Sequence, residues 1–283
     1  MNLIQLYKNL NIIKEAKLWD ILKNIVVEEK LAQKKEEPEK EIKRNNQYKI
    51  MLEIAQIRRL SIWIFLIPLL AINLCLFISQ NPDFLENTIF EVDQLGRSAF
   101  SIPYLDGSLS ISRASRTFPQ YLIFKPSMIL TSVFLYYYWT MNNNLVNKLY
   151  STSVNYKFKI FGILSAIFLA IHSIFLGIKF DIQLYKLFRR VVLLLFIIFE
   201  IVAQGYLVYH FYKLKIKLEK LIYKKILIMK FILVTILATV AILSLPILIT
   251  KGNTHFKHAL EWNYFVGVIL FYLFSRFFWR RTT

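Results

Sequence analysis

The side chains of this chain that could do chemistry are a few ionisable residues set in apolar surroundings. Glu200 stands near the middle of the apolar stretch 190–212, and Gln204 follows one helical turn later on the same face. A carboxyl group inside such a stretch is costly and is a functional candidate by default. Two roles remain open for Glu200: an interhelical hydrogen bond made by a partly protonated carboxyl, or a contact with substrate.

A second polar group precedes the last apolar stretch. His255, His258 and Glu261 stand at positions i, i+3 and i+6, which spreads them over about 120° of a helix. This spacing suits a loose cluster better than a tight metal cage. We expect the histidines to lie in a solvated loop and Glu261 to begin a helix near the positive end of its dipole.

His172 lies in the outer part of the third apolar stretch, 159–178. Alone, such a histidine is more often a packed polar residue than a ligand. The alternative is a site that binds metal or moves protons, built from His172, Asp106 and Asp181 together with the histidines at 255 and 258. No paired ligand motif with metal spacing supports that alternative, so we expect no metal site.

The sequence contains none of the strong catalytic or cofactor motifs. It has no GxxxxGK[ST], HExxH, GxSxG or CxxC segment, and 7 glycines leave little room for a phosphate-binding loop. The single cysteine, Cys75, has no second cysteine for a disulfide. We therefore expect no cofactor, and a non-catalytic factor is favoured over an enzyme.

The composition identifies an integral membrane protein of the all-α class. The 283 residues are 56% hydrophobic and 16% aromatic, with a mean hydropathy of +0.45. These values exclude disorder, collagen and a disulfide scaffold. The net charge of +18 comes largely from Lys and Arg that flank apolar stretches, as the positive-inside rule requires, so nucleic acid is not an expected partner.

Six stretches are long and apolar enough to cross a hydrocarbon core of about 30 Å. The sequence therefore predicts a six-helix membrane bundle with an outer loop between its first two spans. Six Tyr and Trp residues near the predicted ends are expected to anchor the spans at the membrane interface: Tyr136, Tyr137, Tyr138, Trp139, Trp262 and Trp279. The predicted spans are 60–80, 121–140, 159–178, 190–212, 227–250 and 262–279.

The short loops predict the orientation of these spans. Stretch 213–225 carries six lysines, the tail after 275 carries three arginines, and Arg58 and Arg59 precede the first span, which places all three in the cytosol. Loop 81–120 has five acidic residues against three arginines and is expected outside or in a lumen. Both termini are then cytosolic, although the basic stretch 179–190 argues against this arrangement.

Residues 1–57 form a separate, charged N-terminal segment ahead of the membrane domain 58–283. Apolar residues between Leu3 and Ile25 recur at helical spacing, which predicts an amphipathic helix before a charged hinge at Pro38. The alternative is a solvated extension with a transient helix. Neither a myristoylation nor a prenylation signal is present.

Short motifs follow the order and spacing found in a known membrane-protein family. Pro-Tyr and Asp-Gly pairs stand in the first outer loop, a Pro-to-Phe segment opens the second span, and an acidic-aromatic pair opens the last. These segments read Ile102-Pro103-Tyr104-Leu105-Asp106-Gly107, Phe118-Pro119-Gln120-Tyr121-Leu122-Ile123-Phe124 and Ala259-Leu260-Glu261-Trp262. Over roughly residues 60–280 the chain thus resembles the Frag/DRAM/Sfk family of six-span membrane proteins.

The resemblance is nearest to the branch that remodels the lipid of GPI anchors, to which Pro68-Leu69-Leu70-Ala71 is similar. It implies a role in lipid handling at the endoplasmic reticulum, Golgi or plasma membrane, with membrane lipid as partner and other membrane proteins as further partners. No catalytic residue set carries over. The stretch 182–186 lacks the histidine that the family often has at the start of its fourth span.

Three functional hypotheses follow. The first is a lipid-binding factor for GPI-anchor remodelling or lipid organisation. The second is a structural subunit of a large organellar membrane complex, and the third is a metal-dependent lipid hydrolase using His172, His255, His258 and Glu261. The lipid-binding or structural candidates are Asp106, Arg113, His172, Glu200, Gln204, His258, Glu261 and Trp262.

One long-range contact is predicted from the topology. Loop 81–120 should fold over the outer mouth of the bundle and bring Asp106 close to Glu261. Arg113 or Arg116 could then pair with either carboxylate. A carboxylate at the hydrocarbon boundary needs such a partner or hydrogen bonds, and the pair would serve either lipid binding or anchoring of the loop.

Overall fold

The computed structural model describes residues 44–91, 101–178, 183–250 and 252–280. The chain divides into two compact units, Met1–Leu52 and Glu53–Thr283. Of the first unit, residues 44–52 are described, and they are helical. The amphipathic helix expected between Leu3 and Ile25 lies outside the described residues.

The described residues form helices, and no strand occurs among them. The first helix, Arg44–Gln80, is followed by three short helical elements. Five long helices follow these elements in the described part of the chain. After the first helix the elements are η1 (Pro82–Leu85), α2 (Pro103–Asp106), α3 (Ile111–Ser115), α4 (Gln120–Tyr150), α5 (Lys157–Phe175), α6 (Gln183–Lys213), α7 (Lys224–Ile249) and α8 (Thr254–Phe278).

Four of these helices are long and apolar enough, by length and composition, to cross a membrane. They are the first helix, α5, α6 and α7, and they correspond to four of the six predicted spans. The other two predicted spans fall on α4 and α8, which are long but less apolar. In α4, buried Gln120, Asn142 and Asn143 lower the apolarity, and these side chains face the protein interior.

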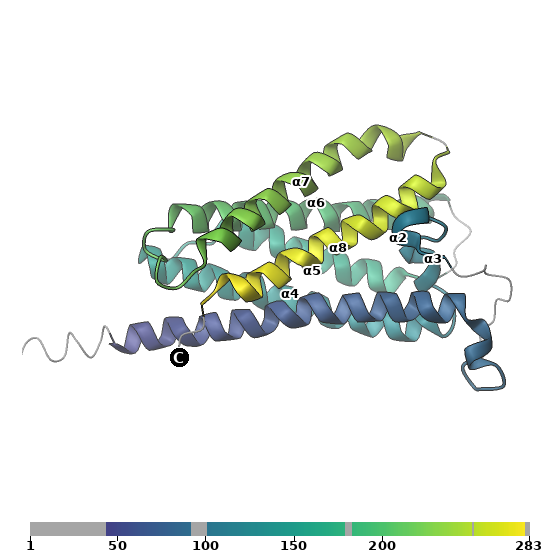
Figure 1. The fold of residues 1–283 in the computed structure, drawn as a ribbon, viewed down its shortest axis with the longest axis horizontal. Coiled ribbons are helices and arrows are strands. Elements are labelled where there is room, and N and C mark those ends of the chain that lie inside the picture. The colour runs from purple at the N-terminus through teal and green to yellow at the C-terminus, as the bar shows by residue number, and fades with distance from the viewer. Residues whose placement is uncertain (1–43, 92–100, 179–182, 251, 281–283) are drawn as a thin grey trace, which may run out of the picture. The chain divides into compact units, whose positions relative to one another are not determined.

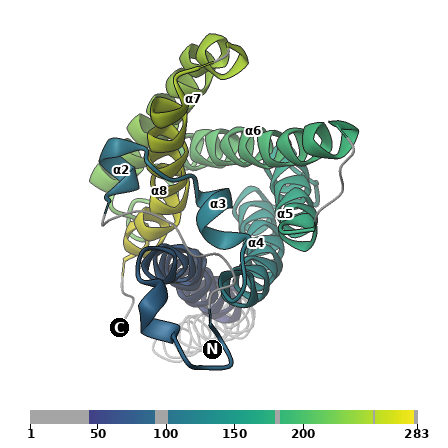
Figure 2. The same cartoon turned by 90° about the vertical axis from the view of Figure 1, so that its right-hand side faces the viewer.

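Within Glu53–Thr283 the long helices lie side by side (Figure 1). Helix α5 packs between α4 and α6, and α7 packs against both α6 and α8. Short α2 rests on α8, while α3 contacts both α4 and α8. Viewed end on, α3 lies among the ends of these helices, so the loop segment covers one end of the bundle (Figure 2).

Two glycines permit close approaches that a side chain would block. Gly107 ends α2 with a φ of +60°, and a Cβ atom there would lie 1.7 Å from the carbonyl oxygen of His255. A Cβ atom on Gly162 of α5 would lie 2.3 Å from the indole ring of Trp139 in α4. The first glycine seats the loop on α8, and the second lets α5 approach α4.

Several aromatic residues that were expected at the membrane interface lie inside the protein instead. Tyr138, Trp139, Trp262 and Trp279 are each at most 2% exposed, so the prediction of interfacial anchoring is wrong for these four. Tyr138 and Trp139 both contact the ring of Tyr272, with centroids 5.0 and 6.5 Å apart. Large rings fill the space between α4 and α8 because edge-to-face packing buries much apolar area.

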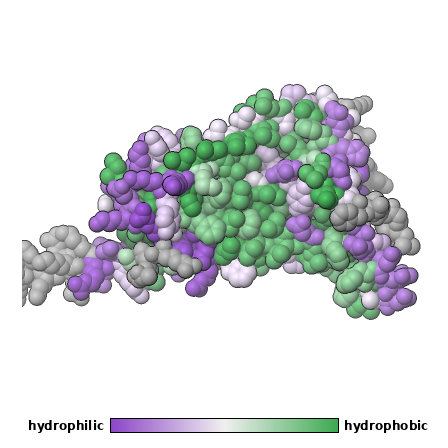
Figure 3. Space-filling view, in the orientation of Figure 1, coloured by the Kyte–Doolittle hydropathy of each residue, from purple (hydrophilic) through white to green (hydrophobic). Residues whose placement is uncertain are grey.

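The basic segments predicted to share one side of the membrane meet at one end of Glu53–Thr283. Arg58 donates to the carbonyl oxygen of Arg280 at 3.5 Å, and the Arg280 N–H donates to Leu221 at 2.8 Å. Loop elements α2 and α3 lie at the opposite end (Figure 1). Hydrophobic side chains cover the middle of the surface between these ends, and hydrophilic ones gather toward both (Figure 3).

Candidate functional site

The loop before α4 is bonded to the first turns of α8. Trp262 donates its indole N–H to the carbonyl oxygen of Leu109 at 2.7 Å, and Asn263 donates to that of Tyr104 at 2.7 Å. The rings of Tyr104 and Trp262 lie 4.7 Å apart between centroids. His258 shares a hydrogen bond of 3.0 Å with the Gly107 carbonyl oxygen. His258 and Trp262 therefore hold the loop in place, which is a structural role.

The side chain of Asp106 accepts hydrogen bonds from the backbone of its own turn. Its carboxylate accepts the backbone N–H of Ser108 at 2.8 Å and that of Ile102 at 3.0 Å. These bonds, with the charge of His255 nearby, hold the pKa of Asp106 below its ordinary value. Asp106 is exposed and does not line the interior, although its loop packs on the helix that carries Glu261.

Glu261 faces the interior about two turns into α8. Because this helix begins at Thr254 and includes His255 and His258, the expectations that these histidines lie in a loop and that Glu261 begins the helix are wrong.

The carboxyl of Glu261 lies beside the backbone N–H groups of Ile111 and Ser112, at the beginning of α3. The two carboxylates that the sequence predicted to lie together thus belong to the same loop-helix contact but bond to different backbone groups. Arg113 is exposed on α3.

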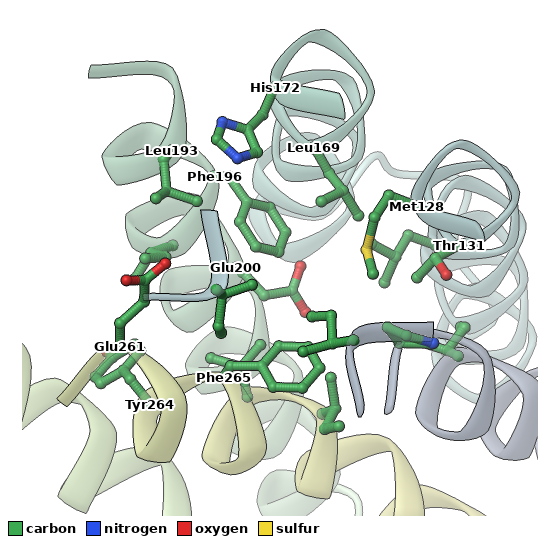
Figure 4. Close-up of a pocket in the computed structure, with 18 of the residues that line it drawn as sticks. Met128, Thr131, Leu169, His172, Leu193, Phe196, Glu200, Glu261, Tyr264 and Phe265 are labelled. Carbon is green, nitrogen blue, oxygen red and sulfur yellow. The ribbon is translucent and has the colours of Figure 1, made fainter. Parts of the chain in front are cut away.

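A cavity of about 120 Å³ lies inside the bundle of Glu53–Thr283. Its walls come from the first helix, α3, α4, α5, α6 and α8, and most of its lining is apolar, including Met128, Leu169 and Phe265. Two carboxyl groups and one imidazole line it: Glu200 from α6, Glu261 from α8 and His172 from α5 (Figure 4). This cavity is the candidate functional site, because it combines an apolar volume with a few convergent polar groups.

Glu200 is fully buried at this cavity and accepts hydrogen bonds from three helices. Ser165 of α5 lies 2.5 Å from one carboxyl oxygen. Gln204, one turn away on α6, donates to the other oxygen at 3.0 Å, and the Tyr272 hydroxyl of α8 donates to that same oxygen. The interhelical hydrogen bond expected of Glu200 is present, and the carboxyl also lines the cavity.

His172 is 8% exposed and lines the cavity from α5. Its Nδ1 atom is buried and has no hydrogen-bond partner among the described residues. A buried polar atom without a partner is costly, so this nitrogen is available to a bound molecule.

A second buried ionisable side chain, which sequence reasoning missed, lies outside the cavity. Lys230 of α7 is fully buried, and its amino group donates to the Ser275 hydroxyl at 2.8 Å. It also lies 4.0 Å from the ring centroid of Phe271 and 5.1 Å from that of Phe278. Lys230 is the fourth residue of the predicted span 227–250, near its basic end, and only the packing of α7 on α8 shows where its amino group lies.

The four residues of the hypothetical hydrolase site are not gathered around one point. His172 and Glu261 line the cavity, whereas His255 is exposed and His258 bonds to the loop backbone. Among the described residues no group of three or more His, Cys, Asp or Glu side chains is placed to hold a metal ion. In the described part of the chain, these side chains therefore do not form the metal site that the hydrolase hypothesis requires.

Comparison with protein-family models, curated proteins and solved structures finds no match to this chain.

Proposed function

We propose that this chain is a six-span membrane protein that handles lipid by holding an apolar chain in the cavity inside its bundle. In this proposal it acts as a lipid-binding factor rather than as an enzyme. The observation that carries the proposal is the cavity itself, an apolar volume lined by helices from both halves of the sequence.

The size of the cavity limits what enters it. An apolar cavity of about 150 Å³ is known to hold a molecule as large as benzene. At about 120 Å³ the present cavity takes a comparable group, so it holds part of an acyl chain rather than a whole lipid. Burying each methylene group there contributes about 0.8 kcal/mol of transfer free energy, although a lipid leaving the bilayer gains much less.

The proposal of six spans adds α4 and α8 to the four helices that meet the criterion of apolarity. Helix α4 has 31 residues and α8 has 25, which at about 1.5 Å per residue exceeds the hydrocarbon core of about 30 Å. Their polar residues, such as Asn142 and Ser275, are buried inside the protein, where lipid does not reach them.

The proposed orientation keeps both termini in the cytosol. The meeting of Arg58, Arg280 and the basic stretch 213–225 at one end supports it, because short basic segments stay on the cytosolic side. The segment with α2 and α3 would then cover the outer or lumenal mouth. On the resemblance described above, we place the protein in a secretory-pathway or plasma membrane, in GPI-anchor lipid remodelling or membrane-lipid organisation, with other membrane proteins as partners.

A plug in the cavity tests the proposal. Met128 of α4 lines the cavity and is 3% exposed, whereas its neighbour Ile129 is 39% exposed. Met128→Trp should fill the volume, and Ile129→Trp should leave it open, with the same residue introduced one position away. We expect lipid copurifying with the protein, quantified by mass spectrometry, to fall for the first variant and stay unchanged for the second.

The thermal stability of both variants serves as the control for folding, since overpacking costs about 1–3 kcal/mol. If a stable Met128→Trp variant retains as much lipid as the unchanged protein, the cavity does not hold lipid and the proposal is wrong.

A further inference from the structure

The carboxyl groups that line the cavity outnumber its basic side chains. Two carboxyl groups, Glu200 and Glu261, and one imidazole, His172, face it. Among the described residues that line it there is no lysine or arginine. An anionic headgroup placed beside Glu200 would therefore meet a carboxyl group in a region of low dielectric constant, where like charges repel strongly.

Two basic residues lie near the cavity without lining it. Arg189 of α6 donates to the Ser112 hydroxyl at 3.3 Å, beside the part of the cavity lined by His172 and Glu261, and its buried Nε has no hydrogen-bond partner among the described residues. Lys230 donates to Ser275 and is enclosed by aromatic rings. The partners of Glu200 in the described part of the chain are neutral side chains, so its charge has no cation to offset it.

Glu200 is a hydrogen-bond acceptor when it is ionised. An ionised carboxylate offers about four lone-pair positions and no donor. Tyr272 and Gln204 donate to one oxygen and Ser165 to the other, and the buried indole N–H of Trp139 also faces this carboxyl. A ligand that binds the carboxylate beside these donors, or in place of one of them, must itself bring an N–H or O–H group.

Ser165 allows Glu200 to exist in either protonation state without a broken hydrogen bond. Its hydroxyl lies 2.5 Å from the Glu200 carboxyl and 2.9 Å from the carbonyl oxygen of Gly162. When Glu200 is ionised, Ser165 can donate to it. When Glu200 holds a proton, the carboxyl can donate to Ser165, which then donates to Gly162. The empty site can therefore be neutral.

Aromatic faces complete the surroundings of this position. Tyr272 and Phe265 of α8 and Phe196 of α6 line the same cavity as Glu200. An ammonium group over such rings is stabilised electrostatically, most strongly where water is excluded. The unpartnered Nδ1 of His172 offers a further polar contact within the cavity.

We propose that the cavity binds the ammonium group of an amine-bearing, single-chain lipid, with Glu200 as its counterion. This inference rests on the lipid-binding function proposed above and specifies the headgroup. When the ammonium group binds, Glu200 releases its proton to the solvent. The ammonium group thus takes the place of the proton at the carboxylate. Besides Glu200, the titratable groups that line or border the cavity come from four helices. They are Tyr264, Tyr272 and Glu261 of α8, His172 of α5, Arg189 of α6 beside His172, and Tyr138 of α4, which packs against Tyr272.

Three probes with the same hydrocarbon chain test the headgroup: oleylamine, oleyl alcohol and oleic acid. Native mass spectrometry of the full chain, with each probe at the same mole fraction of detergent, measures their relative affinities. We expect oleylamine to bind at least about tenfold more tightly than oleyl alcohol, since hydrogen bonds to an ion pair are the stronger ones, and oleic acid to bind least.

Two variants assign the preference to one carboxyl. Glu200→Gln keeps the shape and removes the charge, and should lower the affinity for oleylamine to that for oleyl alcohol. Glu219→Gln changes an exposed carboxylate that pairs with Lys224 in the α6–α7 connection, and should change neither affinity. A preference for the amine that survives in Glu200→Gln would overturn the assignment.

A second measurement uses the unchanged protein, in case Glu200→Gln does not fold. Calorimetry in buffers of different ionisation enthalpy should show about one proton released per oleylamine bound, and none for oleyl alcohol. Equal proton release for the two probes would overturn the exchange at Glu200.

The outcomes separate this inference from the lipid-binding function. Equal binding of all three probes, each lost in Met128→Trp, would reject the ammonium site and leave lipid binding in place. Failure of every probe to bind the unchanged protein would reject both.

Discussion

Two fully buried ionisable side chains, Glu200 and Lys230, lie in the same bundle but in different surroundings. Glu200 accepts hydrogen bonds from Ser165, Gln204 and Tyr272 and borders a cavity. Among the described residues, Lys230 bonds to Ser275 and lies beside the rings of Phe211, Phe271 and Phe278. The first position leaves room for a ligand, whereas the second is closed by packing. Burial of a charge thus does not by itself mark a binding site; burial beside an accessible volume does.

Helix α8 connects the two positions. Tyr272 donates to Glu200, and Ser275, three residues later on the same face, accepts from Lys230. Ser275 also donates to the carbonyl oxygen of Phe271 at 2.9 Å, so Tyr138, 3.0 Å away, is the donor in the bond that these two hydroxyls share. Every hydrogen-bonding position of Ser275 is occupied, which is typical of a structural contact.

The largest effect is expected where the packing around Lys230 is removed. Phe271→Ala deletes a fully buried ring and should lower the free energy of unfolding by about 3–5 kcal/mol. Phe277→Ala removes a ring that is 55% exposed, six residues further along α8 from Phe271, and should cost far less in detergent. Thermal unfolding of the two purified variants measures the difference, and equal losses would show that the Lys230 position is not packed as described.

An intermediate effect on stability is expected when the serine beside Lys230 or the serine beside Glu200 is replaced by alanine. Ser275→Ala leaves the donors of Lys230 and Tyr138 without their acceptor and should cost about 1–3 kcal/mol. Ser165→Ala removes one of three partners of Glu200, which retains Tyr272 and Gln204 and can become neutral, so the loss should be about 1 kcal/mol or less. A larger loss for Ser165→Ala, measured by the same unfolding assay, would reverse the comparison.

The smallest effect is expected for the ammonium group itself. Lys230→Met keeps an unbranched side chain of similar length and removes a charge that has no carboxylate partner among the described residues. Replacement of a buried ion by an apolar side chain is often neutral or stabilising, so stability should change by about 1 kcal/mol or less. A loss of several kcal/mol would mean that the cation is required, and the lysine position would then need a functional explanation as well.

Features that depend on a single segment of the sequence were predicted well. Four of the predicted spans coincide with long apolar helices, because hydropathy and length are properties of a segment alone. Glu200 and Gln204 share a helix face as their spacing requires, and they are hydrogen-bonded. That much follows from helical periodicity without knowledge of the neighbouring helices.

What the sequence could not provide depends on how helices pack. Tyr138 and Trp139 look like interface residues by position, yet both are buried, with their rings packed against Tyr272 of α8. Asp106 and Glu261 were expected to meet, but the turn of Asp106 satisfies its carboxylate locally while Glu261 faces α3. The cavity could not be foreseen, since its walls come from six elements and no one segment carries a signal for it.

The most direct test of the account is an experimental map of the protein in lipid nanodiscs at a resolution that shows single acyl chains. The account predicts elongated density inside the bundle that contacts Met128 and Leu169 and ends at Glu200, and its absence in Met128→Trp. A cavity in the unchanged protein that is closed by its own side chains, or that holds only ordered water, would contradict it.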